Sequence, residues 1–254
     1  MHTILIPILI NLGLGALLGL AGGMLGIGGG LIAIPLLGYF YGMDQHLAQG
    51  TALVMIAPNV LIGFVRYRQR HHFELRGVVL MCVFSTLAAW LAAHLATGMD
   101  SHHLRLAFAA FLVVLAVYFG LRSRGATAAS HSQASPLPPA ALPLLGLASG
   151  AMSGIFTVGG GLVVVPALVN LFKMAQARAQ GIALALVVPG ALVALGTYAR
   201  AGNVSWSTGL PLAAGGVLTV SSGVALAHRF SEAALRFMFS LVLLGTAVLM
   251  FLPA

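Results

Sequence analysis

Two glutamines of this chain have the type and the spacing to bind an ion. Gln49 and Gln180 stand in nearly identical hexapeptides, AQGTAL from Ala48 and AQGIAL from Ala179. A glutamine amide is neutral and donates through its NH2 group. A pair of such amides could hold an oxyanion without the desolvation cost of a buried arginine. The alternative is structural, because a polar residue near the start of a helix can also satisfy free backbone groups.

Two glycine-rich stretches are the second candidate for ion binding. GGMLGIGGGLIAIP, from Gly22 to Pro35, has six glycines in fourteen residues, and VGGGLVVVP follows the same pattern from Val158. A helix that begins after three glycines directs unpaired backbone N–H groups and its positive dipole end into the break. Glycine also lets a ligand approach closely. We therefore expect an anion there, the alternative being that the glycines only allow close helix packing.

The candidate binding residues come from these two duplicated motifs. They are Gly26, Gly28, Gly29, Gly30, Gln49, Gly50 and Thr51 in the first half, and Gly159, Gly160, Gly161, Gln180 and Gly181 in the second. Valine at position 29 or 160 should fill the space that the anion needs. Alanine at position 49 or 180 should weaken binding more gently, by removing one hydrogen bond to the anion.

The elements that carry these motifs are predicted to lie in a lipid bilayer. The chain has 254 residues, 60% of them hydrophobic and 6% charged, with a mean hydropathy of +1.04. The apolar stretches long enough to lie in hydrocarbon are 4–41, 51–65, 77–99, 106–121, 143–172, 181–199, 206–227 and 237–252. This composition predicts an all-α polytopic membrane protein.

The charges and the cysteine count exclude several other classes. The net charge of +8 does not indicate nucleic acid, because the 12 Lys and Arg residues are scattered between apolar segments. The single cysteine, Cys82, excludes an internal disulfide framework. The N-terminus lacks the pattern of a cleaved signal peptide. We expect the bilayer and a small anion as partners, no nucleic acid, no cofactor and no metal; the oligomeric state is left open.

The chain consists of two similar halves. Adding 131 to a position in the first half gives its counterpart in the second over most of the length. The matched residues include Gly28 and Gly159, Gln49 and Gln180, Pro58 and Pro189, Tyr67 and Tyr198, and Arg105 and Arg236. We expect a first transmembrane repeat at 1–121, a flexible cytoplasmic linker at 122–140 and a second transmembrane repeat at 141–254.

The direction of the halves depends on the glycine-rich stretches. If the glycines turn the chain back, each half has about five membrane helices or half-helices, and the two repeats are inverted. If not, each half has four crossings. Inversion places ten Lys and Arg residues inside and two outside, against seven and five for the alternative. The positive-inside rule favours inversion, with both termini in the periplasm and Gln133 in the cytoplasm.

The sequence resembles the TauE/SafE-type sulfite exporters, also called the TSUP family, over nearly all of its length. The resemblance rests on GIGGGLIAIP, VGGGLVVVP, the two glutamine hexapeptides and AGNVSW from Ala201. It implies a transporter of sulfite, thiosulfate or organosulfonates in the bacterial cytoplasmic membrane, and no enzyme. Ile182 stands where the first half has Thr51, so the two half-sites are not chemically identical.

Two other functions stay open at this stage. An anion channel would need a continuous polar pore rather than paired breaks around one site. An intramembrane serine protease would use Ser153 with His94 or His228 as the base, but the duplication already explains Ser153 as the partner of Gly22.

Few side chains could couple transport to protons or bind metal. The four acidic residues, Asp44, Glu74, Asp100 and Glu232, fall at or beyond the ends of the apolar segments. His94 is the best titratable candidate inside one, although a hydrogen-bonded histidine near a helix end is the simpler interpretation. Cys82 is interpreted as a small buried apolar residue. The pairs His71-His72 and His102-His103 are interpreted as loop histidines, because adjacent residues diverge on a helix.

Overall fold

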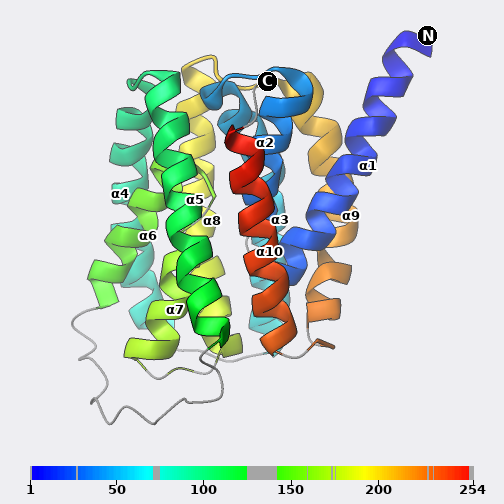
Figure 1. Ribbon diagram of the computed structural model, residues 1–254. Helices are drawn as coiled ribbons and strands as arrows, with labels where there is room; N and C mark the ends of the chain where they lie inside the picture. The colour runs from blue at the N-terminus through cyan, green and yellow to red at the C-terminus, as the bar shows by residue number, and fades with distance from the viewer. Residues whose placement is uncertain are drawn as a thin grey trace.

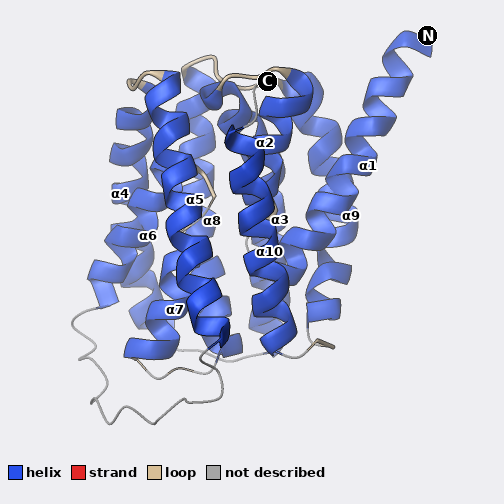
Figure 2. Cartoon of the chain, in the orientation of Figure 1, coloured by secondary structure: helices blue, strands red, loops and turns tan. Residues whose placement is uncertain are grey.

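The computed structural model describes residues 2–26, 28–70, 75–124, 142–158, 160–172, 174, 176–227, 229–230 and 232–251. These residues form α-helices and no strand (Figures 1 and 2). The first half has α1 (His2–Leu25), α2 (Gly30–Tyr41), α3 (Gln45–Arg70), α4 (Leu75–Thr97) and α5 (Ser101–Arg124). The second has α6 (Leu142–Phe156), α7 (Gly161–Leu171), α8 (Gln176–Arg200), α9 (Trp206–Ala227) and α10 (Glu232–Phe251).

The helices have the length and surface of a polytopic membrane protein. Among the described residues, six helices are long and apolar enough to cross a membrane, and α2, α6 and part of α10 are shorter apolar helices. Large apolar side chains point outward from them, such as Leu95 and Leu218, which are 70% and 72% exposed. Such a surface is stable when lipid covers it. The predicted fold class, an all-α polytopic membrane protein, is confirmed.

Each glycine-rich stretch ends one apolar helix and begins a shorter one. The first break lies between Leu25 and Gly30, where Gly26, Gly28 and Gly29 have positive φ angles of 72°, 69° and 90°. The second lies between α6 and α7, where Thr157 has a φ of 56°. With 12 and 11 residues, α2 and α7 are shorter than the roughly 20 residues that a full crossing needs. They are half-helices.

Other glycines form stripes that hold the two halves together. Gly15, Gly19 and Gly23 of α1 face the backbone of α9, and a Cβ atom at Gly19 would lie 2.5 Å from Gly216. Gly146, Gly150 and Gly154 of α6 face the backbone of α4 in the same way. The stripes are 131 residues apart, so the first helix of each half packs on the fourth helix of the other. For these glycines, close packing is the explanation.

The ends of the helices lie as an inverted pair of repeats would place them. In Figure 1, α1 begins and α10 ends at one end of the molecule, while α5 ends and α6 begins at the other. The half-helix α2 lies toward the first end and α7 toward the opposite end. The inverted relation stays a prediction, which this arrangement supports. The helix α5 extends to Arg124, and most of the expected linker, including Gln133, lies outside the described residues.

Candidate functional site

The two helix breaks meet at the contact between the halves. A Cβ atom at Gly30 would lie 3.6 Å from the carbonyl oxygen of Thr157, and one at Gly161 would lie 4.0 Å from that of Gly26. Positions 26 and 157, and positions 30 and 161, are each 131 residues apart. The same contact is therefore made twice, once from each half. Asn59 of α3 also donates from Nδ2 to the carbonyl oxygen of Gly28, at 3.4 Å.

The two glutamines are held by tyrosines of the opposite halves. The hydroxyl of Tyr198 donates to Oε1 of Gln49 at 2.6 Å, and that of Tyr67 donates to Oε1 of Gln180 at 2.8 Å. Nε2 of Gln180 lies 3.5 Å from the position of a Cβ at Gly26, so this amide borders the first break. The sequence marked both tyrosines as a duplicated pair without assigning them a role. Their shared offset of 131 with the glutamines was the signal that could have found it.

The amide nitrogen of Gln49 has no hydrogen-bond partner among the residues that the structure describes. The side chain is fully buried, with 0% of its surface exposed, and its oxygen already accepts the bond from Tyr198. Both N–H bonds of Nε2 are therefore available to an acceptor. Leaving a buried donor unpaired costs about 1–3 kcal/mol, so this atom indicates a place for an acceptor.

The half-helices present their positive ends at the breaks. Neither the N-cap of α2, Gly29, nor that of α7, Gly160, makes a side-chain cap hydrogen bond. In the second break, the N–H of Gly160 donates to Oγ of Ser153 at 3.0 Å. The counterpart of Ser153 is Gly22, which has no side chain to accept such a bond. The two half-sites therefore differ here as well as at Thr51 and Ile182.

Most glycines of the breaks face protein atoms. A Cβ would lie 2.6 Å from Val60 at Gly28 and 2.3 Å from Ile56 at Gly30. At Gly29 it would lie 2.7 Å from the Leu18 carbonyl oxygen, and at Gly160 it would lie 2.2 Å from Ser149. Valine at 29 or 160 would thus strike neighbouring helices rather than only fill a binding space. Gly26 and Gly161 have room instead, with no atom nearer than 3.5 Å.

The residues beside Gln49 anchor a loop. A Cβ at Gly50 would lie 1.8 Å from the carbonyl oxygen of Asn203, and the hydroxyl of Thr51 accepts the N–H of Ser205 at 3.0 Å. Both contacts fix the AGNVSW segment against α3. Ile182 has no oxygen with which to repeat this bond. Gly181 is buried in α8, and Gly159 lies outside the described residues.

The other candidates from the sequence lie away from the breaks or take part in packing. Nδ1 of His94 is 3.0 Å from the Trp90 carbonyl oxygen, one turn earlier on α4, as expected of a hydrogen-bonded histidine near a helix end. Sγ of Cys82 donates to the Ala185 carbonyl oxygen at 3.4 Å, between α4 and α8. Oγ of Ser153 accepts the N–H of Gly160 and so stabilises the second break.

The histidine pairs do not form a metal site in the described part of the chain. His102 and His103 are exposed at the start of α5, while His71, His72 and His228 lie outside the described residues. No group of three or more His, Cys, Asp or Glu side chains that could hold a metal occurs among the residues that the structure places.

The breaks are polar but uncharged. Among the described residues, the buried polar side chains are Asn, Gln, His, Ser and Thr, and no Asp, Glu, Lys or Arg is buried. Buried charges are costly unless they are paired. Neutral donors and helix ends can hold a small anion and also release it, as a transport site requires.

Comparison with known proteins identifies relatives along the whole chain. The family described as "Sulfite exporter TauE/SafE" matches residues 11–250. A "Probable membrane transporter protein" of Xylella fastidiosa (strain 9a5c) is 30% identical over 95% of this chain and 94% of its own. A protein of Methanocaldococcus jannaschii with the same description is 26% identical over 94% of this chain and 93% of its own. No solved structure gives a significant match.

Proposed function

Because the chain belongs to the sulfite exporter TauE/SafE family, we propose that it is a secondary transporter of a small sulfur-containing anion, bound where its two halves meet. Sulfite, thiosulfate and organosulfonates are the candidate substrates. The protein works in the bacterial cytoplasmic membrane as two inverted repeats, with both termini in the periplasm. The anion lies between the helix breaks, held by the amides of Gln49 and Gln180 and by the backbone at the starts of α2 and α7.

The unpartnered amide of Gln49 carries this proposal. Its oxygen is held by Tyr198, so its two N–H bonds are oriented before any ligand arrives. A preoriented donor loses little entropy on binding. An oxyanion accepts such bonds, whereas a cation would be repelled by the NH2 group and by the positive helix ends. The site therefore favours anions.

Uptake into proteoliposomes tests the substrate class. Purified protein is reconstituted, and the accumulation of sulfite, thiosulfate, sulfate, taurine and chloride is compared with that in protein-free liposomes. We expect saturable uptake of at least one sulfur-containing anion and little of chloride. Equal, non-saturating passage of every anion would contradict the proposal.

Counterflow separates a carrier from a channel. Liposomes preloaded with the transported anion should take up labelled anion transiently against its gradient, because a carrier exchanges one bound ion for another. A channel gives no such overshoot. The absence of counterflow together with conductance in a planar bilayer would establish the channel instead.

A further inference from the structure

A cavity with polar and apolar walls lies beside the outer half of α2, away from the glycine breaks. Its volume is about 210 Å³, and its walls include Ile34 and Pro35 of α2, Gln45 at the start of α3, Arg105 of α5 and Met250 of α10. Both α3 and α5 begin at this cavity. Their positive dipole ends therefore lie close together there.

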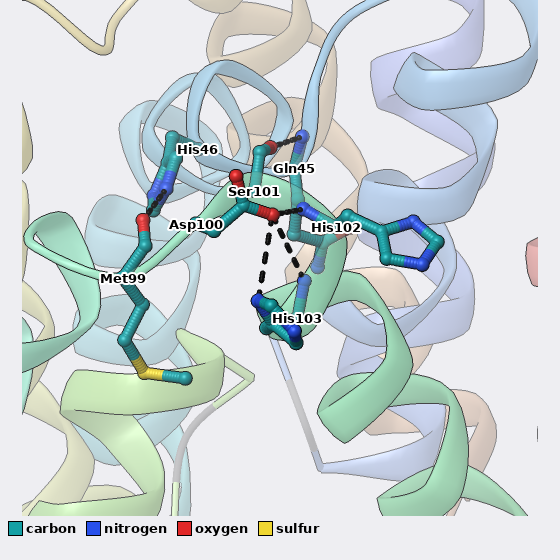
Figure 3. A network of polar contacts seen from close by, with 7 residues as sticks. All are labelled: Gln45, His46, Met99, Asp100, Ser101, His102 and His103. Carbon is teal, nitrogen blue, oxygen red and sulfur yellow. Dashed lines mark hydrogen bonds and ion pairs between the residues drawn. The ribbon is translucent and has the colours of Figure 1, made fainter.

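Gln45 lines this cavity and carries an unpartnered amide. Its side chain lines the cavity, only 6% of its surface is exposed, and Nε2 has no hydrogen-bond partner in the described part of the chain. The backbone N–H of Gln45 donates to Oγ of Ser101 at 3.0 Å (Figure 3). Because Ser101 accepts this bond, the proton of its hydroxyl can be donated to another group in the cavity. Two neutral side chains that can donate hydrogen bonds thus line the cavity.

Arg105 supplies a fixed positive charge to the cavity wall. Nε and Nη2 donate to the Met250 carbonyl oxygen at 3.2 and 2.8 Å, which anchors the guanidinium against the end of α10. Asp44 and His102 also line the cavity, and both are exposed. Oδ1 of Asp44 accepts the N–H of Leu47 at 2.8 Å, so this carboxylate caps α3 at the mouth.

The cavity and Gln49 are one helical turn apart along α3, because Gln45 lines the cavity. Gln45 and Gln49 are four residues apart and therefore lie one above the other on the helix. Within the described residues, each has a buried Nε2 without a hydrogen-bond partner. The same spacing recurs in the second half, where Gln176 precedes Gln180, and Arg236 matches Arg105. The side chains of Gln176 and Arg236 lie outside the described residues.

We infer that this cavity is an access site, where Gln45, Ser101 and Arg105 bind a small oxyanion before it passes along α3 to Gln49. The inference rests on the proposed function, since the ligand is the transported anion. An ion entering from this end of the molecule would thus reach the central site through the access site.

Uptake kinetics of sulfite in phosphatidylcholine liposomes test the access site. Removing its amide in Gln45→Leu should raise KM about tenfold while the maximal rate changes less than twofold, because the central site is intact. Gln45→Glu, of nearly equal volume, should raise KM further by repelling the anion. Arg105→Gln should also raise KM and weaken its dependence on salt, whereas Arg105→Lys keeps the charge and should retain that dependence.

The matched control is His103→Gln. His103 is exposed, lies on the same turn of α5 as Arg105 and does not line the cavity. The KM of this variant should therefore equal that of the wild type. Size-exclusion chromatography verifies that each variant is folded. If Gln45→Leu does not fold, Gln45→Glu is used for the test instead. An unchanged KM in a folded Gln45 variant at low salt would overturn the access site and leave the proposed function intact. Failure of the wild type to transport any anion of the panel would overturn both.

Discussion

At the scale of the residue, the central feature is the exchange of tyrosine and glutamine between the halves. Each tyrosine hydroxyl donates to the oxygen of the opposite glutamine and leaves the nitrogen as the group that can donate to an anion in the proposed site. An amide without this contact could rotate and present its oxygen, which repels an anion. The tyrosines therefore position the glutamines, and they need not contact the substrate themselves.

Removing either hydroxyl should weaken anion binding. In Tyr67→Phe and Tyr198→Phe the glutamine loses its fixed orientation, so we expect about a two- to tenfold higher Kd for the transported anion. Titration calorimetry on detergent-purified protein measures this, with Tyr118→Phe on the outer side of α5 as the control. If both variants keep the wild-type Kd, as the control should, the hydroxyls do not orient the glutamines.

The sequence predicted these residues only in part. The repeated hexapeptides identified both glutamines, and the constant offset paired Tyr67 with Tyr198. The tyrosine hydroxyls could not be assigned to the glutamines, because the bonds join residues 149 and 113 positions apart. Such contacts depend on how the helices of the two halves pack, which a single sequence does not determine.

At the scale of the element, the glycines have separate roles. Those of α1 and α6 allow close packing against α9 and α4. Those at positions 28, 29, 30 and 160 let the backbone of each break pack closely on the neighbouring helices. Among the described glycines of the breaks, only Gly26 and Gly161 would place a Cβ at ordinary contact distance, 3.5 Å or more from its neighbours. The sequence alone suggested one role for all of them, because glycine has no side chain by which to distinguish packing from ligand access.

Alanine at two adjacent positions should separate these roles. In Gly161→Ala the new Cβ has ordinary contacts, the nearest at 3.6 Å from Ala183, so the protein should keep its melting temperature while transport falls. In Gly160→Ala the Cβ lies 2.2 Å from Ser149, which should destabilise the fold by about 1–3 kcal/mol. Thermal unfolding in detergent and uptake are measured together. Wild-type uptake by Gly161→Ala would contradict a substrate position beside this residue.

The packing stripe of α1 allows a parallel test of stability. Gly19→Ala places a Cβ 2.5 Å from Gly216 and should separate α1 from α9, with a lower melting temperature. Gly13→Ala, on the same helix, meets nothing within 4 Å. It should leave stability unchanged or raise it by up to about 1 kcal/mol, since alanine is the better helix former. If both changes shift the melting temperature equally, the glycine stripe is not the contact between α1 and α9.

At the scale of the whole molecule, composition and duplication predicted the fold class and the two breaks. The hydropathy, the 131-residue offset and the glycine clusters sufficed for a helical membrane protein with two half-helices. The interlocking of the halves did not follow from them. The packing of α1 on α9 and of α6 on α4 depends on which glycine stripe meets which backbone, and many pairings would satisfy the same pattern.

The inverted arrangement predicts the location of three positions. Cysteines introduced after residues 2 and 254 in a Cys82→Ala background should react with a membrane-impermeant reagent from the periplasmic side of intact cells. A cysteine at Gln133 should react only after the membrane is opened. Termini on opposite sides of the membrane would contradict the arrangement, and both termini inside would favour parallel repeats.

The central claim is that the paired amides bind the transported anion, and its most direct measurement is the Kd of that anion for Gln49→Leu and Gln180→Leu. Leucine keeps much of the side-chain volume and removes the donor. With correct folding verified by thermal unfolding, each variant should bind about ten- to a hundredfold more weakly than the wild type, the value of one hydrogen bond to a charged group. If both folded variants bind and transport the anion as the wild type does, the glutamines are structural and the account of the site is wrong.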